Sequence, residues 1–135
     1  MKAAAYLCDA ATVREGLAHI LGGGANLLRR RNFPAPMAVK LVIMLEQDLT
    51  EARNSHKVNV VIRSDQGPDV LGRIEGALEP QGEPKDPGLD LPLVIPVILP
   101  LDTVVLPQPG RYAIDIHIEG ADPISLKFGM TLLDP

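Results

Sequence analysis

Residues 111–132 have the sequence RYAIDIHIEGADPISLKFGMTL, which is the clearest pattern in this chain of 135 residues. From 111 to 119, apolar side chains occupy the even positions and polar side chains occupy most of the odd ones, and residues 124–132 repeat this alternation. A period of two residues is typical of a β-strand that has one buried and one solvated face. Because Gly-Ala-Asp at 120–122 separates the two segments, we predict that they form an antiparallel hairpin.

A second hairpin is predicted in the middle of the chain. Residues 57–63 alternate between apolar and polar side chains, and the turn-forming sequence Asp-Gln-Gly-Pro follows at 65–68. Residues 69–79 are expected to return beside the first strand. Gly72 and Gly76 share one face of this returning strand, which suggests a bend or a close neighbour there.

Two further segments are more apolar than a strand with one solvated face. Residues 37–45 are apolar on both faces, which indicates a strand that is central in its sheet or covered by another segment. Residues 89–101 contain prolines at 92, 96 and 100, and proline cannot donate to a sheet ladder. We therefore predict an edge strand whose prolines face solvent while the intervening Leu, Ile and Val point inward. Residues 80–88 are the longest predicted loop.

The remaining segments are short. Residues 3–13, 17–21 and 25–30 predict a meander of strands, separated by Arg-Glu-Gly and Gly-Gly-Gly. Residues 47–54 predict one short helical turn, with Asp48 as its N-cap.

Eight or nine short strands with frequent turns are typical of an antiparallel sandwich. We therefore predict a single all-β domain over 1–135, an immunoglobulin-like antiparallel β-sandwich with at most one short helical turn. Tyr112 follows the corner sequence Leu-Pro-Gln-Pro-Gly at 106–110. A hydrogen bond from its hydroxyl to the backbone a few residues upstream would form the tyrosine corner that favours the immunoglobulin-like fold.

Composition excludes several classes of function. With 13 basic and 17 acidic residues the net charge is −4, which gives no overall field for nucleic acid or anionic lipid. The longest apolar run is too short and too interrupted to span a bilayer. The lone Cys8 forms no internal disulfide and lacks basic neighbours that would activate its thiol, and the first residues do not resemble a signal peptide. We expect a cytoplasmic protein that binds neither nucleic acid nor membrane.

No catalytic signature is present in the sequence. Asp115, His117 and Glu119 share one strand face, but side chains along one strand diverge, so a metal site would need His56 or Glu46 from another strand. For His56, at a strand entrance, we expect a turn hydrogen bond. The sequence therefore predicts no enzyme activity, no metal and no cofactor.

The candidate functional surface is an interface. Three consecutive arginines form the one concentrated basic patch, which is either a recognition site for an acidic protein surface or phosphate, or an ordinary solvated strand end. Neighbouring apolar residues would supply the anchor of such an interface. His19, in an apolar strand, is expected in the core or in an interface. The predicted interface residues are Arg29, Arg30, Arg31, Phe33, Ala38, Val42 and Met44, with Arg30 on the face opposite Arg29 and Arg31.

Four short motifs extend along nearly the whole chain: Tyr-Leu-Cys-Asp at 6–9, Gly-Gly-Gly at 22–24, Phe-Pro-Ala-Pro at 33–36 and Leu-Pro-Gln-Pro-Gly-Arg-Tyr at 106–112. With these motifs the chain resembles a family of small uncharacterised bacterial proteins, mostly actinobacterial, of unknown function. The resemblance implies a β-sandwich. None of the motifs is catalytic, so the resemblance implies no substrate and no site.

We therefore expect a non-catalytic protein-interaction or assembly subunit, whose partner is another protein or further copies of itself in a homo-oligomer. The alternative is a small-molecule or carbohydrate-binding module that uses the end loops at 47–56 and 80–88, although the few aromatic residues count against sugar stacking. A third interpretation is a small hydrolase-type enzyme that uses His56 or His117. It requires a carboxylate within hydrogen-bond reach of one of these rings.

Overall fold

The computed structural model describes residues 1–81, 88 and 90–133. Over these residues the chain is all-β, with twelve strands and one helix of four residues. The strand count exceeds the prediction because residues 3–13 divide into two strands and because two pairing segments are only two residues long. The elements are β1 (Lys2–Cys8), β2 (Ala10–Arg14), β3 (Leu17–Leu21), β4 (Leu27–Arg30), β5 (Ala35–Pro36), β6 (Lys40–Gln47), α1 (Leu49–Ala52), β7 (His56–Ser64), β8 (Val70–Leu78), β9 (Leu93–Pro100), β10 (Val105–Leu106), β11 (Gly110–Ile118) and β12 (Ile124–Leu132).

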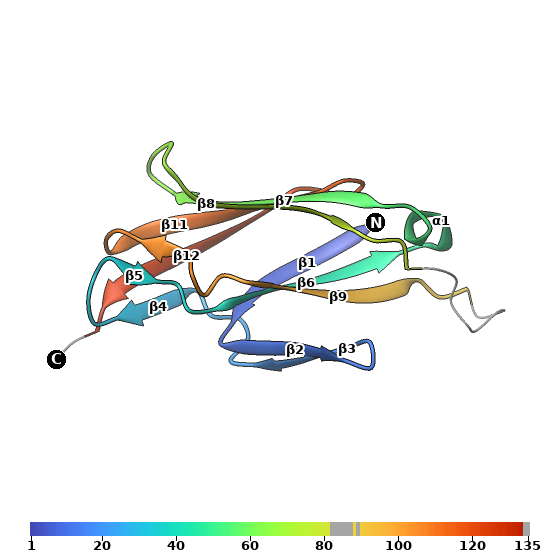
Figure 1. Cartoon of the computed structure of the whole chain (residues 1–135), viewed down its shortest axis with the longest axis horizontal. Coiled ribbons are helices and arrows are strands. Elements are labelled where there is room, and N and C mark those ends of the chain that lie inside the picture. Colours follow the sequence, from blue (N-terminus) through green and yellow to red (C-terminus); the bar gives the residue numbers. More distant parts are fainter. Residues whose placement is uncertain (82–87, 89, 134–135) are drawn as a thin grey trace.

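Two sheets face each other across a common core (Figure 1). The larger sheet has the strand order β4-β12-β11-β7-β8, and the smaller has the order β1-β6-β9. Leu41 and Ile43 on β6 and Ile114 and Ile116 on β11 are at most 1% exposed and belong to one apolar cluster. Burial of such inward faces, at about 25 cal/mol per Å² of apolar surface, holds the two layers together.

Both predicted hairpins are present in the larger sheet. β11 pairs antiparallel with β12, and β7 pairs antiparallel with β8 with a register shift between Ile62 and Arg63. Gly72 lies at the predicted close approach, since a Cβ there would be 3.3 Å from a methyl group of Val104. Gly76 has no such neighbour within 4 Å.

The smaller sheet confirms two predictions about apolar segments. β9 lies at the sheet edge, with Ile95, Val97 and Leu99 packed against the core and its prolines on the opposite face. Of these prolines, Pro100 is exposed as predicted, whereas Pro96 is half-buried. β6 is central between β1 and β9. β6 begins at Lys40 rather than at residue 37 because Ala38 has a φ of 53°, which interrupts extended backbone. Most of the predicted loop at 80–88 falls on residues 82–87, outside the described residues.

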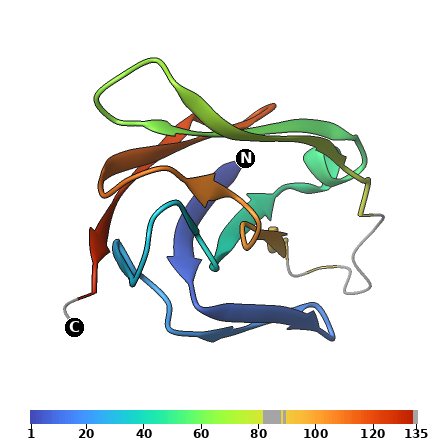
Figure 2. The ribbon, with the colours of Figure 1, turned by 60° about the vertical axis from the view of Figure 1, so that its left-hand side comes forward.

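The predicted N-terminal meander is corrected by the structure. β1 joins the smaller sheet, whereas β2 and β3 form a separate two-stranded hairpin (Figures 1 and 2). Glu15 and Gly16 at its turn have φ values of 53° and 75°, the pair of positive values that a type I′ turn requires. The hairpin contacts β6 and β9 on the outer side of the smaller sheet, so it covers the outward face of β6.

The larger sheet is not wholly antiparallel, which corrects a second expectation. β4 pairs parallel with β12, from Leu27 opposite Gly129 to Arg30 opposite Leu132. Parallel neighbours need a long connection, and here residues 31–123 separate the two strands. Local alternation therefore identified β4 as a strand but carried no information about its direction.

Two predicted local contacts are confirmed. Asp48 caps α1 by accepting a 2.7 Å hydrogen bond from the Glu51 amide, and the Glu51 carboxylate accepts a 2.9 Å bond from the Asp48 amide. The Tyr112 hydroxyl donates to the carbonyl of Gln108, which is the contact of a tyrosine corner. Within the part of the chain that the structure describes, no helix is long and apolar enough to cross a membrane.

Candidate interaction surfaces

The predicted arginine patch is divided by the fold. Arg29 and Arg31 are exposed, whereas Arg30 is half-buried and lies on the opposite face, as alternation predicted. The Arg30 guanidinium donates to the carbonyls of Arg29 (2.7 Å), Pro36 (3.2 Å) and Met37. Arg30 therefore ties β4 to the segment that leads into β6, and only its two neighbours are available to a partner.

The apolar residues predicted for the same interface also differ in position. Phe33 is half-buried against the core, Ala38 is exposed, and Met44 is half-buried on β6. Val42 is 0% exposed, because it lies between β1 and β9 and under the hairpin. Val42 is therefore not on the surface of this fold. The interface role of the predicted residues stays a prediction.

The outer face of the β2–β3 hairpin is the more exposed apolar surface. Leu17 and Leu21 are 64% and 71% exposed, whereas Ala18 and Ile20, between them on β3, are half-buried toward β6 and β9. His19 is exposed on the same outer face, so it does not lie in the core, and its predicted alternative place in an interface stays a prediction. A hollow of about 370 Å³ lies beside Leu21, and its lining residues are Ala10, Ala11, Thr12, His19, Ile20 and Leu21. Sequence reasoning missed this surface, although alternation alone places Leu17, His19 and Leu21 on one face.

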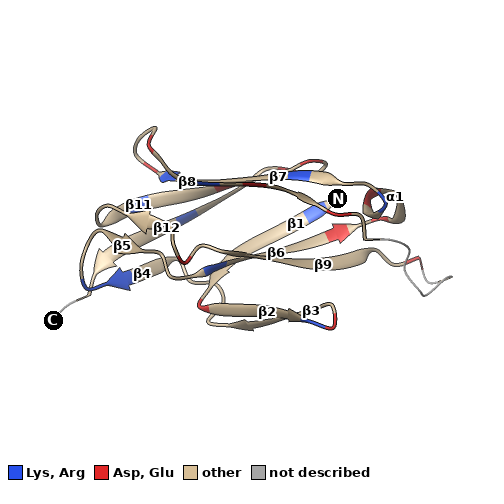
Figure 3. Cartoon of the chain, in the orientation of Figure 1, with Lys and Arg blue, Asp and Glu red and all other residues tan. Residues whose placement is uncertain are grey.

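This side of the molecule is also poor in charge. β3 and β9 contain no Lys, Arg, Asp or Glu, and β2 contains only Arg14 at its end, as Figure 3 shows. Val94 on β9 is 53% exposed. Exposed apolar side chains that lie together on a surface with little charge often mark an interaction site. The hairpin side is therefore a candidate contact surface.

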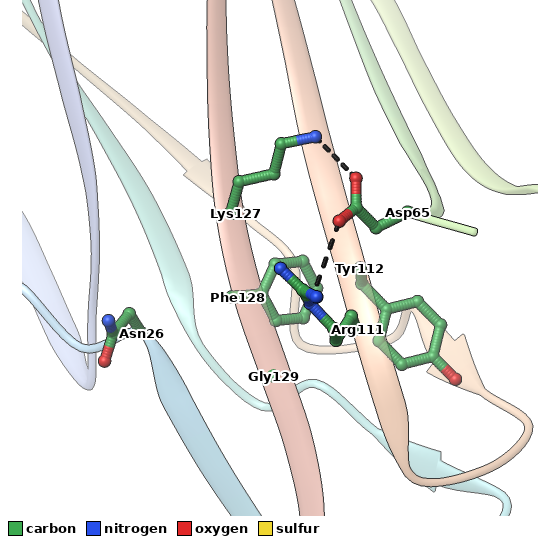
Figure 4. Close-up of a pocket in the computed structure, with 7 residues that line it drawn as sticks. All are labelled: Asn26, Asp65, Arg111, Tyr112, Lys127, Phe128 and Gly129. Atoms are coloured by element: carbon green, nitrogen blue, oxygen red, sulfur yellow. Dashed lines mark hydrogen bonds and ion pairs between the residues drawn. The ribbon is translucent and has the colours of Figure 1, made fainter.

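The larger sheet presents a charged outer face instead. A pocket of about 240 Å³ lies over β11 and β12, lined by Asn26, Asp65, Arg111, Tyr112, Lys127, Phe128 and Gly129 (Figure 4). Asp65 accepts a hydrogen bond from Lys127, which lowers the pKa of this carboxyl below its usual value. The Arg111 guanidinium lies 3.9 Å from the same carboxylate and its side chain is 74% exposed.

A second ion pair lies on the same outer face. Arg63 Nε donates to Asp115 over 2.6 Å, and the Ser125 hydroxyl donates to Asp115 over 2.9 Å. The hydrogen bond from Arg63 is the main cause that lowers the pKa of Asp115, with a smaller effect from Ser125 and a partial opposing effect of burial. Asp115, one of the acidic residues considered for metal binding, is therefore part of a cross-strand ion pair.

We predict that Asp115→Asn reduces the sensitivity of the fold to acid. Because the folded carboxyl has a pKa below its ordinary value of 3.8, the pair stabilises the fold above that value and its contribution is lost as the pH falls through the lower folded pKa. The free energy of unfolding of the wild type should therefore fall more steeply between about pH 5 and pH 2 than that of the variant. Urea titrations at several pH values measure this, and equal slopes would contradict it.

His56, His117 and Cys8 differ in burial and in their contacts. The two ring nitrogens of His56 lie 3.1 Å and 2.7 Å from the carbonyl oxygens of Glu119 and Glu51. The ring therefore links α1 to the β11–β12 turn, in agreement with the turn hydrogen bond predicted for His56. His117 is exposed. Burial raises the pKa of the Cys8 thiol, which is 0% exposed. Among the described residues, no three His, Cys, Asp or Glu side chains come together as a metal site requires.

Comparison with known proteins adds one finding. A family of unknown function, DUF6941, matches residues 3–130, whereas no curated protein and no solved structure matches the chain. The expected membership of an uncharacterised family is confirmed over most of the chain, and its expected bacterial distribution stays a prediction. The chain belongs to DUF6941, a family of unknown function.

Proposed function

We propose that this protein is a non-catalytic interaction subunit that assembles with a second copy of itself through the outer face of the β2–β3 hairpin. The observation that carries the proposal is the exposure of Leu17 and Leu21, at 64% and 71%, on strands with almost no charge. An isolated two-stranded hairpin is only marginally stable in water. The inner face of this hairpin packs on β6 and β9, while its outer face is left to solvent.

A second copy fits this face because the hairpin is self-complementary. Leu17 projects near the turn, and the hollow of about 370 Å³ lies toward the other end of the hairpin, beside Leu21. The two leucines are four residues apart on one strand, which corresponds to roughly 13 Å. A two-fold axis across the hairpin would place each Leu17 in the hollow of the other copy, which is the isologous arrangement of most homodimers. The net charge of −4 is carried elsewhere, so the contact brings few like charges together.

We predict that Leu17→Ser combined with Leu21→Ser converts the protein from a dimer to a monomer. Light scattering coupled to size exclusion should give twice the monomer mass of 14.5 kDa for the wild type and the monomer mass for the variant. Both side chains are exposed, so the free energy of unfolding of the monomer should change by no more than about 0.5 kcal/mol. Leu49→Ser, at a leucine on α1 that is 42% exposed, is the matched control and should remain dimeric. A monomeric wild type at every concentration tested, or a dimeric double variant, would contradict the proposal.

We also infer that the two-layer arrangement is a variant of the immunoglobulin-like fold. The facing of β1-β6-β9 on β12-β11-β7-β8 supports this, because it corresponds to strands A, B and E facing G, F, C and an added strand. The tyrosine corner at the start of β11, in the position of strand F, also supports it. The chain differs from antibody domains in having one cysteine and no tryptophan, and in the hairpin inserted after β1.

A further inference from the structure

His19 lies in the middle of the outer face of the β2–β3 hairpin. Residues directly opposite each other in an antiparallel pair share a face, and His19 on β3 lies opposite Thr12 on β2. Leu17 and Leu21 are each two residues away from His19 along β3, so the three side chains project to the same side. The His19 side chain is exposed and borders the hollow of about 370 Å³. Its imidazole therefore occupies the centre of the surface proposed for self-association.

The two-fold symmetry of the proposed dimer brings the two copies of His19 together. In that dimer, Leu17 of each copy enters the hollow beside Leu21 of the other copy. A two-fold axis that exchanges these two positions passes midway between them, and the residue midway along β3 is His19. The two imidazoles therefore face each other close to the axis. This placement rests on the proposed function, because the proposed dimer defines the axis.

The hairpin itself offers no nearby carboxylate to a charged imidazole. On its outer face the charged residue is Arg14, which is basic and lies opposite Leu17. The acidic residues are Glu15 in the turn and Asp9 just before β2. Both lie at the ends of the hairpin, roughly 10 Å or more along the strands from the pair of Thr12 and His19. A second copy related by the two-fold axis adds the same groups at the same distances from the axis.

The strands on which the hairpin packs do not supply a carboxylate either. β9 contains no Lys, Arg, Asp or Glu over Leu93–Pro100. The charged residues of β6 are Lys40 and Glu46, but β6 contacts the inner side of the hairpin, whereas His19 projects from the outer side. Lys40 is also paired with Asp102. Among the described residues of these strands, none therefore offsets positive charge on the outer face.

We propose that His19 makes self-association depend on pH, so that the dimer forms when both imidazoles are neutral and dissociates when they are protonated. A histidine ordinarily takes up its second ring proton between about pH 8 and pH 5. Neutral rings pack against the leucines of the contact, and each ring keeps one nitrogen as a hydrogen-bond acceptor. Protonated rings bring two like charges together out of water, with the basic Arg14 as the charged neighbour on that face, and this disfavours the dimer.

Proton uptake is linked to dissociation in a definite direction. The separated monomers bind these protons more readily than the dimer, because an exposed imidazole keeps its contact with water. The dimer therefore weakens as the pH falls through the histidine range.

The overall charge of the chain acts in the opposite direction. The net charge is −4 with neutral histidines, and protonation of all three histidines brings it to −1, which reduces the repulsion between two copies. Dissociation on acidification therefore identifies a local effect at the contact rather than general repulsion.

The test measures the dimer dissociation constant of the whole protein by analytical ultracentrifugation at about pH 8 and about pH 5.5. For the wild type, the dissociation constant should increase about tenfold or more at the lower pH. His19→Gln keeps a polar side chain that takes up no proton, so its dissociation constant should change by less than about threefold. Its dimer at the lower pH also shows that acid has not unfolded the chain. His19→Lys is positively charged at both pH values, so it should weaken the dimer about tenfold or more already at about pH 8.

His117→Gln is the matched control, because His117 is also exposed but lies on β11 of the larger sheet. It should keep the full pH dependence of the wild type. A wild-type dimer whose dissociation constant does not change with pH would overturn this inference and leave the proposed dimer intact. An equal pH dependence in His19→Gln, or an undiminished dimer in His19→Lys, would also overturn it. A wild type that is monomeric at about pH 8 at every concentration would overturn the proposed function and this inference together.

Discussion

Val42→Asp is expected to destabilise the fold by roughly 4 kcal/mol or more, which is enough to unfold many domains of this size. Val42 is 0% exposed at the centre of β6, between Tyr6 on β1 and Ile98 on β9, with the hairpin over it. An aspartate here would either bury an unpaired charge or displace the hairpin, and both are costly. Thermal and urea denaturation measure the loss.

Val94→Asp is the matched control for this substitution. Val94 is also an outward-facing valine of the smaller sheet, but it is 53% exposed at the edge strand β9. Its replacement should change the free energy of unfolding by no more than about 0.5 kcal/mol. A stable Val42→Asp variant that differs only in oligomeric mass would contradict this account, because it would make Val42 a residue of an exposed interface.

Ile114→Ala should cost about 2–5 kcal/mol through the lost transfer energy and the cavity it leaves. Ile114 is 0% exposed in the middle of β11, with β7 on one side and β12 on the other, and it faces the smaller sheet across the core. The urea midpoint should fall with little change in the slope of the transition.

Ile124→Ala provides the comparison for the core substitution. Ile124 begins β12 and is only half-buried against the same core, so it should lose clearly less than Ile114. Equal costs at the two positions, or a cost below about 1 kcal/mol at Ile114, would show that β11 does not form the centre of the core.

The sequence predicted those parts of the fold that local physical chemistry determines. Alternation over 111–132 and 57–79 identified two hairpins, because one face of each strand is buried and the other is solvated. The prolines of β9 identified an edge strand because they remove ladder donors. Asp48 and Tyr112 made the predicted contacts because both depend on residues only a few positions away.

The sequence could not predict contacts between segments that are distant along the chain. The parallel pairing of β4 with β12 and the departure of the β2–β3 hairpin from the sheet depend on what each strand meets in space. The hairpin also explains why β6 is apolar on both faces, since it covers the outward one. Because the sequence does not show this cover, Val42 was predicted at an interface. The structure buries Val42 and instead exposes Leu17 and Leu21 on the hairpin.

The arginines also show that sequence patterns do not predict contacts between distant segments. Arg29 to Arg31 are conspicuous because they are consecutive, but Arg30 is used inside the chain. Arg111 comes from a strand far along the sequence, and only the cross-strand register places it near Arg29. No spacing in the sequence could have shown this proximity.

Amide hydrogen exchange of the wild type at two protein concentrations tests the central claim most directly. Assembly through the hairpin predicts that peptides covering residues 9–22 exchange more slowly at the higher concentration, while those covering β8, at the far edge of the larger sheet, do not change. Exchange in the hairpin that is independent of concentration, or protection that increases on β8 instead, would contradict it.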